Sequence, residues 1–133
     1  MTGRESGKMK ETRVLVCVTG QRTCERLIGV GHELAIERSA ELSVLHVARK
    51  GPGLMDSVPE ASALEYLFKV SSEHGADMTV IRSDEVVHTV ESHARKIGAS
   101  LIVLGRPRAG IKDLTAEMRR HMPDIEFHIV NTE

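Results

Sequence analysis

The sequence predicts an α/β domain of the doubly wound type, in which five parallel strands form one sheet between two layers of helices. Short runs rich in Val, Leu and Ile alternate with longer segments of helical period, which is the pattern of βαβ units. The length, 133 residues, is that of one domain with a core of its own. Because crossovers between parallel strands are right-handed, this alternation gives a three-layer α/β/α fold with the strand order 3-2-1-4-5.

The five expected strands are short runs of apolar, mostly branched residues. In chain order they cover 13–19, 42–48, 77–83, 100–105 and 126–131. The first and the fourth are nearly continuous in aliphatic residues, as expected of central strands that helices cover on both faces. Residues 1–11 are polar and show no apolar period. We therefore expect a disordered N-terminal arm over 1–11, followed by one domain over 12–133.

The four expected helices lie between these strands. They cover 21–39, 58–74, 84–97 and 111–121. In the second of them, apolar residues recur at helical spacing at Ala61, Leu64, Leu67 and Phe68. The third has the clearest end signals: Ser83 as N-cap, Asp84 and Glu85 in the first turn, and Gly98 after the last turn. Pro123 is expected to stop the fourth helix.

The composition excludes several classes of function. Eighteen Lys and Arg residues against nineteen Asp and Glu residues leave a net charge of −1, so no general polyanion-binding surface is expected. The chain has one Tyr, two Phe and no Trp, too few rings for a stacking platform for nucleic acid strands. No apolar run approaches the length of a membrane span, and two cysteines cannot form a disulfide framework. We expect a cytoplasmic protein without a membrane span.

The turn after the first strand, VTGQRTCERLI (18–28), is a candidate phosphate cradle. Gly20 allows a close approach of the backbone, and Thr19, Gln21 and Thr23 offer polar groups beside a helix N-terminus. The two sharp nucleotide fingerprints, G-x-G-x-x-G and G-x-x-x-x-G-K-[ST], are absent. The alternative interpretation is an ordinary turn between a strand and a helix that Thr23 caps.

The exit of the fourth strand, LGRPRAGIK (104–112), carries the strongest local signal. Gly105 allows a close approach, and Arg106, Arg108 and Lys112 place three cations within seven residues. In a 3-2-1-4-5 sheet the first and fourth strands are neighbours at the topological switch point, where such folds bind ligands. An anionic ligand is therefore expected between this exit and the turn after the first strand. The alternative is a solvated basic loop.

The cysteines and histidines give weaker signals. Four residues separate Cys17 from Arg22, whereas the loop of cysteine phosphatases needs five, and Cys17 lies in an apolar strand where thiols pack. Cys24 stands in the first turn of a helix, where a cysteine can have a lowered pKa, but a lone cysteine on a helix is more often inert. The seven histidines follow no metal-binding spacing; His88 and His93 are five apart and are not expected on one helix face. No catalytic residue and no metal site is predicted.

The order of elements and four segments resemble the universal stress protein superfamily, and more narrowly the universal-stress-like domain of Kdp-type osmosensitive sensor histidine kinases. The segments are RVLVCVTGQRTCERLI (13–28), LSVLHV (42–47), HGADMTVIRSDEVVHTVESHARKIGASLIVLGRPR (74–108) and IEFHIV (125–130). The resemblance implies a regulatory nucleotide-binding domain, often dimeric through its last strand. It also implies a sensor kinase or a transporter component as a partner in stress or osmotic signalling.

The resemblance also implies which residues would hold the nucleotide. ATP-binding members carry an acidic residue after the first strand and a G-x-x-G-x9-G-[ST] loop after the fourth, where this chain has Thr19 and Gly105 followed by Arg108. Kdp-type domains share the Gly-Arg-x-Arg turn of 105–108, and some bind cyclic di-AMP through hydroxyl residues after the first strand and an aromatic end of the second. The corresponding places hold Thr19, Gln21 and His46, the last followed by Val47.

The function expected from the sequence is a non-enzymatic signalling module that binds ATP, AMP or cyclic di-AMP. The nucleotide would contact Thr19, Gly20, Gln21, Thr23, His46, Val47, Gly105, Arg106 and Arg108. A first alternative is a dimeric protein-interaction module with a vestigial pocket, since the ATP-binding glycines are missing. A remote alternative is a small hydrolase or phosphotransfer enzyme that uses Cys17 or Cys24.

Overall fold

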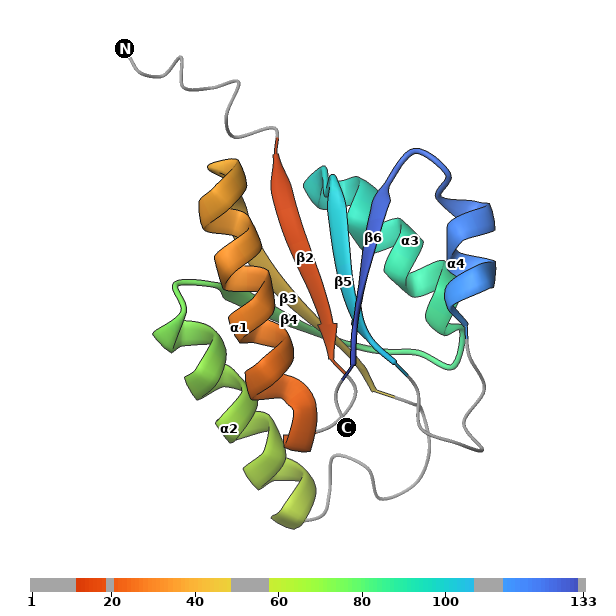
Figure 1. The fold of residues 1–133 in the computed structure, drawn as a ribbon. Coiled ribbons are helices and arrows are strands. Elements are labelled where there is room, and N and C mark those ends of the chain that lie inside the picture. Colours follow the sequence, from red (N-terminus) through yellow and green to blue (C-terminus); the bar gives the residue numbers. More distant parts are fainter. Residues whose placement is uncertain (1–11, 19–20, 49–57, 107–113, 132–133) are drawn as a thin grey trace.

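Strands and helices alternate throughout the part of the chain that the computed structural model describes, residues 12–18, 21–48, 58–106 and 114–131. Figure 1 shows a sheet with one pair of helices on each face. In chain order the elements are β2 (Arg13–Val18), α1 (Gln21–Arg38), β3 (Glu41–Ala48), α2 (Val58–Glu73), β4 (Asp77–Arg82), α3 (Val86–Ile97), β5 (Leu101–Gly105), α4 (Thr115–His121) and β6 (Glu126–Val130). The predicted arm over 1–11 lies outside the described residues.

The sheet has the order β4-β3-β2-β5-β6 and is parallel throughout. Numbered by chain order, this is the predicted 3-2-1-4-5 arrangement, so the predicted fold class is confirmed. The register places Val18 of β2 beside His46 of β3, and Gly105 of β5 beside Val130 of β6. Because all strands run in one direction, their carboxyl ends lie together at one edge of the sheet.

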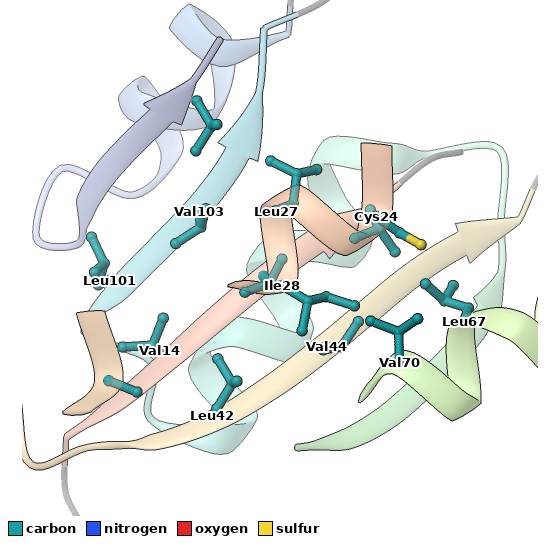
Figure 2. Packing of buried hydrophobic residues seen from close by; sticks show 14 residues of the cluster. Val14, Cys24, Leu27, Ile28, Leu42, Val44, Leu67, Val70, Leu101 and Val103 are labelled. Atoms are coloured by element: carbon teal, nitrogen blue, oxygen red, sulfur yellow. The ribbon is translucent and has the colours of Figure 1, made fainter. Parts of the chain in front are cut away.

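Side chains of β2 alternate between the two faces of the sheet and form the centre of the core. Val14, Val16 and Val18 pack with α1 and α2. Figure 2 shows a close view of this cluster. Leu15 and Cys17 pack on the opposite face with α3 and α4. All five are less than a tenth exposed, which is the burial expected of a central strand covered on both sides.

Helix α1 approaches the sheet closely at Gly31. A Cβ built on this glycine would lie within 3.0 Å of Val16 Cγ2 and 3.2 Å from Leu42 Cδ1. A Cβ at Gly29, half a turn earlier in the helix, would meet no atom within 4 Å. The absence of a side chain at position 31 therefore sets how closely α1 packs on β2 and β3.

The start of α3 differs from the prediction, whereas its end agrees with it. The helix begins at Val86 after Glu85, and the Glu85 side chain makes no capping hydrogen bond. Ser83 Oγ accepts from the Glu85 backbone N–H at 3.0 Å, so Ser83 closes a local turn ahead of the helix. The prediction that Ser83 caps the helix and that Asp84 and Glu85 lie in its first turn was therefore wrong. Gly98 ends the helix in the left-handed conformation, φ +71°, as predicted.

The buried stripe of α2 also differs from the prediction. Leu67, Val70 and Ser71 are buried, whereas Phe68 is 51% exposed. One residue turns a helix by about 100°, so Phe68 points away when Leu67 faces the core. Helix α2 lies at the border of its layer and packs against α1 and β4. Only a narrow stripe of its surface is therefore covered. The apolar row expected from the sequence is therefore not the buried row, since Ala61 and Phe68 at its two ends are exposed.

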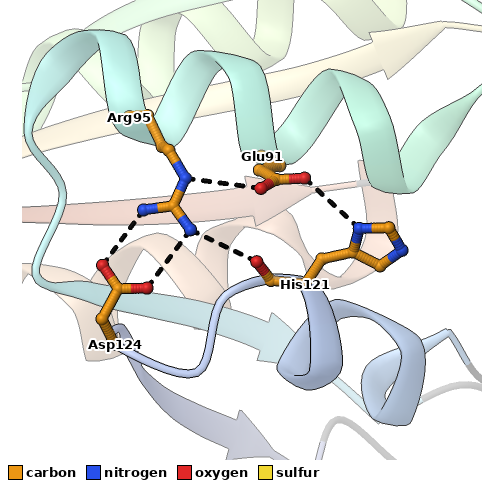
Figure 3. Close-up of polar contacts among 4 residues, drawn as sticks. All are labelled: Glu91, Arg95, His121 and Asp124. Carbon is orange, nitrogen blue, oxygen red and sulfur yellow. Dashed lines mark hydrogen bonds and ion pairs between the residues drawn. The ribbon is translucent and has the colours of Figure 1, made fainter.

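Polar contacts tie α3 to the turn between α4 and β6. The Arg95 guanidinium donates to both carboxylate oxygens of Asp124, at 3.0 and 3.2 Å, to Glu91 at 3.3 Å, and to the His121 carbonyl at 3.2 Å (Figure 3). The hydrogen bond from Arg95 holds the pKa of Asp124 below its ordinary value. This group connects helices of one layer and lies away from the carboxyl ends of the strands.

Among the described residues, no helix has the length and apolar character needed to cross a membrane.

Candidate functional site

The candidate site lies where β2 and β5 end side by side. The chain leaves β2 into α1 on one face of the sheet and continues from β5 toward α4 on the other face (Figure 1). This is the topological switch point of the fold, the place where open α/β sheets bind ligands. The predicted site residues lie near or just after the carboxyl ends of β2, β3 and β5, and the register brings these ends to one edge.

His46 is fixed beside the end of β2. Its ring Nδ1 lies 3.0 Å from the carbonyl oxygen of Val18, and the residue is partly buried. Since a carbonyl only accepts, Nδ1 carries the proton and donates, and Nε2 of the neutral ring is left as an acceptor. Val47, the next residue, is partly buried. The contact to Val18 places an imidazole directly beside the strand residue that precedes Thr19, although Thr19 and Gly20 themselves lie outside the described residues.

Gln21 begins α1, so Gln21 and Thr23 belong to the first turn of an 18-residue helix. The first backbone N–H groups of a helix have no partner within the helix, and the helix dipole places partial positive charge at the same end. No acidic residue stands in this first turn to balance that charge. The switch point is thus bordered by a helix end that favours an anion.

The exit of β5 is held against β6. Gly105 is partly buried at the end of the strand, and the backbone N–H of Arg106 donates to the carbonyl oxygen of Val130 at 2.9 Å. The Arg106 side chain is exposed, whereas Arg108 lies outside the described residues. The hydrogen bond continues the pairing of β5 with β6 by one residue. Arg106 is thereby placed at the carboxyl edge of the sheet.

A further arginine, Arg26 of α1, reaches the same edge and was missed in the sequence. Its Nε donates to the carbonyl oxygen of Asn131, directly after the end of β6, at 3.0 Å. Arg26 and Arg106 therefore contact the carbonyl oxygens of consecutive residues, Asn131 and Val130. Arg26 follows Arg22 by four residues, a spacing that places both on one side of a helix; this was the available signal.

Neither cysteine has the character of a nucleophile. Cys17 is buried in the core, as predicted, and burial raises the pKa of its thiol to about 12. Cys24 is also buried, and its pKa is raised, first by burial and then by the charge of Glu25. Of the two interpretations for Cys24, the lowered pKa is contradicted and the inert thiol is supported, because the side chain turns into the core between α1 and the sheet.

The histidines lie in different parts of the fold, except that His88 and His93 are both on α3. In the part of the chain that the structure describes, no three His, Cys, Asp or Glu side chains come together as a metal site would require. His32 and His74 form an edge-to-face ring pair with centroids 5.2 Å apart. His88 and His93 border a common groove beside α3, although their five-residue spacing does not place them on one face of the helix.

Comparison with known proteins decides the family. The family model described as "Universal stress protein family" matches residues 11–116, which is most of the chain and includes β2 through β5. The chain belongs to the universal stress protein family. Among curated relatives, the sensor protein KdpD of Mycobacterium tuberculosis is 35% identical over 97 residues, which are 72% of this chain and 11% of KdpD. The universal stress protein YxiE of Bacillus subtilis is 29% identical, over 77% of this chain and 84% of YxiE.

Solved structures of universal stress proteins share the fold. UspA from Lactobacillus plantarum superimposes with a TM-score of 0.67 at 20% identity, over 92% of this chain and 99% of UspA. A universal stress protein in complex with cAMP gives 0.63 at 18% identity, over 92% and 98% of the two chains. The universal stress protein of Archaeoglobus fulgidus in complex with dAMP gives 0.60 at 17%, again over 92% and 98%. This chain therefore shares its fold with solved universal stress proteins.

Proposed function

We propose that this universal stress protein is a non-enzymatic signalling module that binds an adenine nucleotide or a cyclic dinucleotide at the switch point. The observation that carries the proposal is the convergence of His46, the first turn of α1 and Arg106 at one edge of the sheet. These groups come from segments far apart in sequence. Family members of the same fold in complex with cAMP and dAMP support the class of ligand.

The phosphate groups would lie between the two turns. Gly20, Gln21 and Thr23 would supply N–H and polar groups at the start of α1, while Arg106 and Arg108 would supply charge from the exit of β5. A guanidinium can donate two parallel hydrogen bonds to one phosphate, which fixes its orientation as well as its charge. In this proposal the pocket holds ATP, AMP or cyclic di-AMP without cleaving it.

The base would lie at the end of β3. His46 offers Nε2 as an acceptor, or as a donor after protonation, and the aliphatic side chain of Val47 offers an apolar surface. Thr19 would hydrogen-bond the nucleoside from the end of β2, and Gly105 would allow its close approach to β5. Since the chain has only three aromatic rings besides histidines, the base would be held by aliphatic contacts and hydrogen bonds.

The partner belongs to the proposal as well. The similarity to KdpD covers a domain-sized part of that sensor protein, and it supports a link to a sensor kinase or a transporter component in the cytoplasm. A dimer would form through β6, which is the outer strand of the sheet and offers a backbone edge to a second copy. Within the described strand, His128 and Glu126 are exposed on this element.

Isothermal titration of the full chain with ATP, AMP and cyclic di-AMP tests the nucleotide site. We expect saturable binding of at least one of them, and a loss of roughly tenfold or more in affinity for the double variant Arg106→Ala with Arg108→Ala. The matched control replaces Lys69 and Arg120, exposed cations on α2 and α4, by alanine. Absence of binding at millimolar ligand, or equal affinity in both double variants, would rule out the proposal.

The alternative is a dimeric interaction module in which the pocket is vestigial. It is favoured by Arg108, which stands where ATP-binding members have the second glycine of their loop. Both functions include a dimer through β6, so sedimentation velocity separates them only together with the nucleotide titration. The backbone groups of Glu126 and Val130 pair with the β5 side, so the N–H of Ile129 faces the free edge of β6. A dimer that forms without nucleotide, is lost in Ile129→Pro and is accompanied by no nucleotide binding supports the alternative; a monomer under all conditions excludes it.

A further inference from the structure

A groove of about 260 Å³ lies between α3 and β4, on the border of the sheet opposite to β6. Its walls are formed by Ile81, His88, Thr89, Ser92, His93 and Lys96. Strand β3 separates β4 from β2, so the groove is not part of the switch point between β2 and β5. The proposed nucleotide function uses none of these six residues.

The path of α3 explains why the groove exists. The helix connects β4 to β5 and packs on β3 and β2, so it does not cover β4, and all six residues of β4 keep some exposure. Val87, Val90 and Ala94 of α3 face the core. Residues four apart form a row on a helix, so one row of polar residues is 88, 92 and 96, and a second row is 89 and 93. The two rows form one wall, and Ile81 belongs to the other.

The chemistry of this wall is one-sided. It offers two imidazoles, one ammonium group and two hydroxyls, and no carboxylate is among the lining residues. The acid whose charge acts on His93 is Asp77, which accepts a hydrogen bond from Ser43 Oγ at 2.7 Å and has Arg13 at 3.8 Å. Asp77 is thus also held by contacts to β3 and β2, although Arg13 lies closer to Glu41, at 2.7 Å. The lining of the groove therefore offers hydrogen-bond donors, and it contains no acidic side chain that would pair with them.

We propose that this groove binds a small phosphate-bearing anion, with Lys96 and the two imidazoles as charge partners and Ser92 and Thr89 as hydroxyl donors. Ammonium, imidazolium and hydroxyl groups donate to phosphate oxygens, and charge-assisted hydrogen bonds of this kind are the strongest that side chains form. Ile81 would contact a short organic group attached to the phosphate. The volume admits inorganic phosphate or a small phosphate monoester. This ligand is independent of the nucleotide at the switch point.

Binding at this groove is coupled to protonation of His93. Burial and the charge of Lys96 lower the pKa of His93, and the charge of Asp77 on β4 acts in the opposite direction. A phosphate beside His93 favours the imidazolium form, so the pKa of His93 rises when the ligand binds. The imidazole therefore takes up a proton on binding. For an anion whose own charge is fixed in this range, such as sulfate, the affinity increases as the pH falls through the imidazole range.

The test is a titration of the full chain with inorganic phosphate, followed by NMR of the histidine ring carbon-bound protons. We expect the His88 and His93 signals to move along one saturating curve, while the signals of His46 and His128 stay in place. The affinity for sulfate, whose charge does not change in this range, should increase as the pH is lowered from about 7.5 to about 6. Signals of His46 would report the proposed nucleotide site, so failure at one site is distinguishable from failure at the other.

Two variants make the test specific. Lys96→Met removes the ammonium group of an exposed residue and should weaken phosphate binding roughly tenfold. Lys69→Met removes an exposed lysine of α2 and should leave it unchanged. Tighter binding of glycerol phosphate than of inorganic phosphate would identify the ligand as a monoester, and the reverse order would identify free phosphate. Linear shifts without saturation, equal binding of succinate, or an unaffected Lys96→Met variant would overturn the proposal.

Discussion

Replacing Gly31 by alanine tests how closely α1 packs on the sheet. The new Cβ would lie within 3.0 Å of Val16 Cγ2 and 3.2 Å from Leu42 Cδ1, whereas ordinary contacts of a Cβ fall between 3.4 and 4 Å. Val16 is fully buried in the central strand β2, and its branched side chain has little rotamer freedom. The clash is therefore relieved only by a shift of α1 away from the sheet.

The magnitude follows from a comparison with Gly29, where a Cβ meets no atom within 4 Å. Both substitutions gain the helix propensity of alanine over glycine, about 0.5–1 kcal/mol, so this term cancels between them. What remains is the cost of overpacking at position 31, about 1–3 kcal/mol. We expect Gly29→Ala to stabilise the fold and Gly31→Ala to destabilise it by about 1–2 kcal/mol relative to the natural sequence.

Urea unfolding followed by far-ultraviolet circular dichroism measures this difference, since the chain has no Trp for fluorescence. A third variant, Val16→Ala, removes the clashing methyl group. In that background Gly31→Ala should cost at least about 1 kcal/mol less, which is the coupling expected of two residues in contact. Equal stability of Gly29→Ala and Gly31→Ala, or no coupling to Val16, would refute the close packing of α1 on β2.

Three further predictions concern groups outside the proposed sites. Because Cys17 and Cys24 are buried with raised pKa values, a thiol reagent at about pH 8 should modify both only when the protein unfolds; modification of the native protein at the rate of a free thiol would contradict this. Arg95 lowers the pKa of Asp124, so the stabilisation is present above the ordinary carboxyl pKa and is lost as the pH falls through the lowered one. The deficit of Arg95→Gln in urea unfolding should therefore shrink between about pH 5 and pH 2, and a constant deficit would contradict the ion pair. Gly98→Ala should cost about 1 kcal/mol, because φ is +71° and no atom lies within 4 Å of the added Cβ, so that only the backbone conformation is strained; unchanged thermal stability would argue against the left-handed cap.

The sequence was sufficient to predict the strands and their order. Runs such as 13–19 and 100–105 are apolar on both faces, and only a central strand between two helix layers buries both faces. Once the runs alternate with helices, right-handed crossovers leave few topologies, and the observed order is the predicted one. The predictions of local detail were wrong at two places. Phe68 is exposed although it belongs to the apolar row of its helix, and Ser83 forms a turn ahead of α3 instead of capping it.

The candidate site was predictable only in part. Residues at strand ends, such as His46 and Arg106, could be assigned to one edge because parallel strands end together. The hydrogen bond from His46 to Val18 and the contact of Arg26 with the end of β6 join residues 28 and 105 positions apart. No local pattern reports such contacts, since they depend on the register of the strands and the placement of α1 on the sheet.

The sequence by itself determined the family, the layers and the edge at which a ligand is expected, because periodicity and strand order depend on local residue patterns. Tertiary structure alone decided the state of side chains whose surroundings come from other elements. Cys24 has a raised pKa because its thiol enters the core instead of remaining at the helix end. His88 and His93 share a groove because α3 leaves β4 uncovered, a consequence of the crossover and not of the spacing of the two residues.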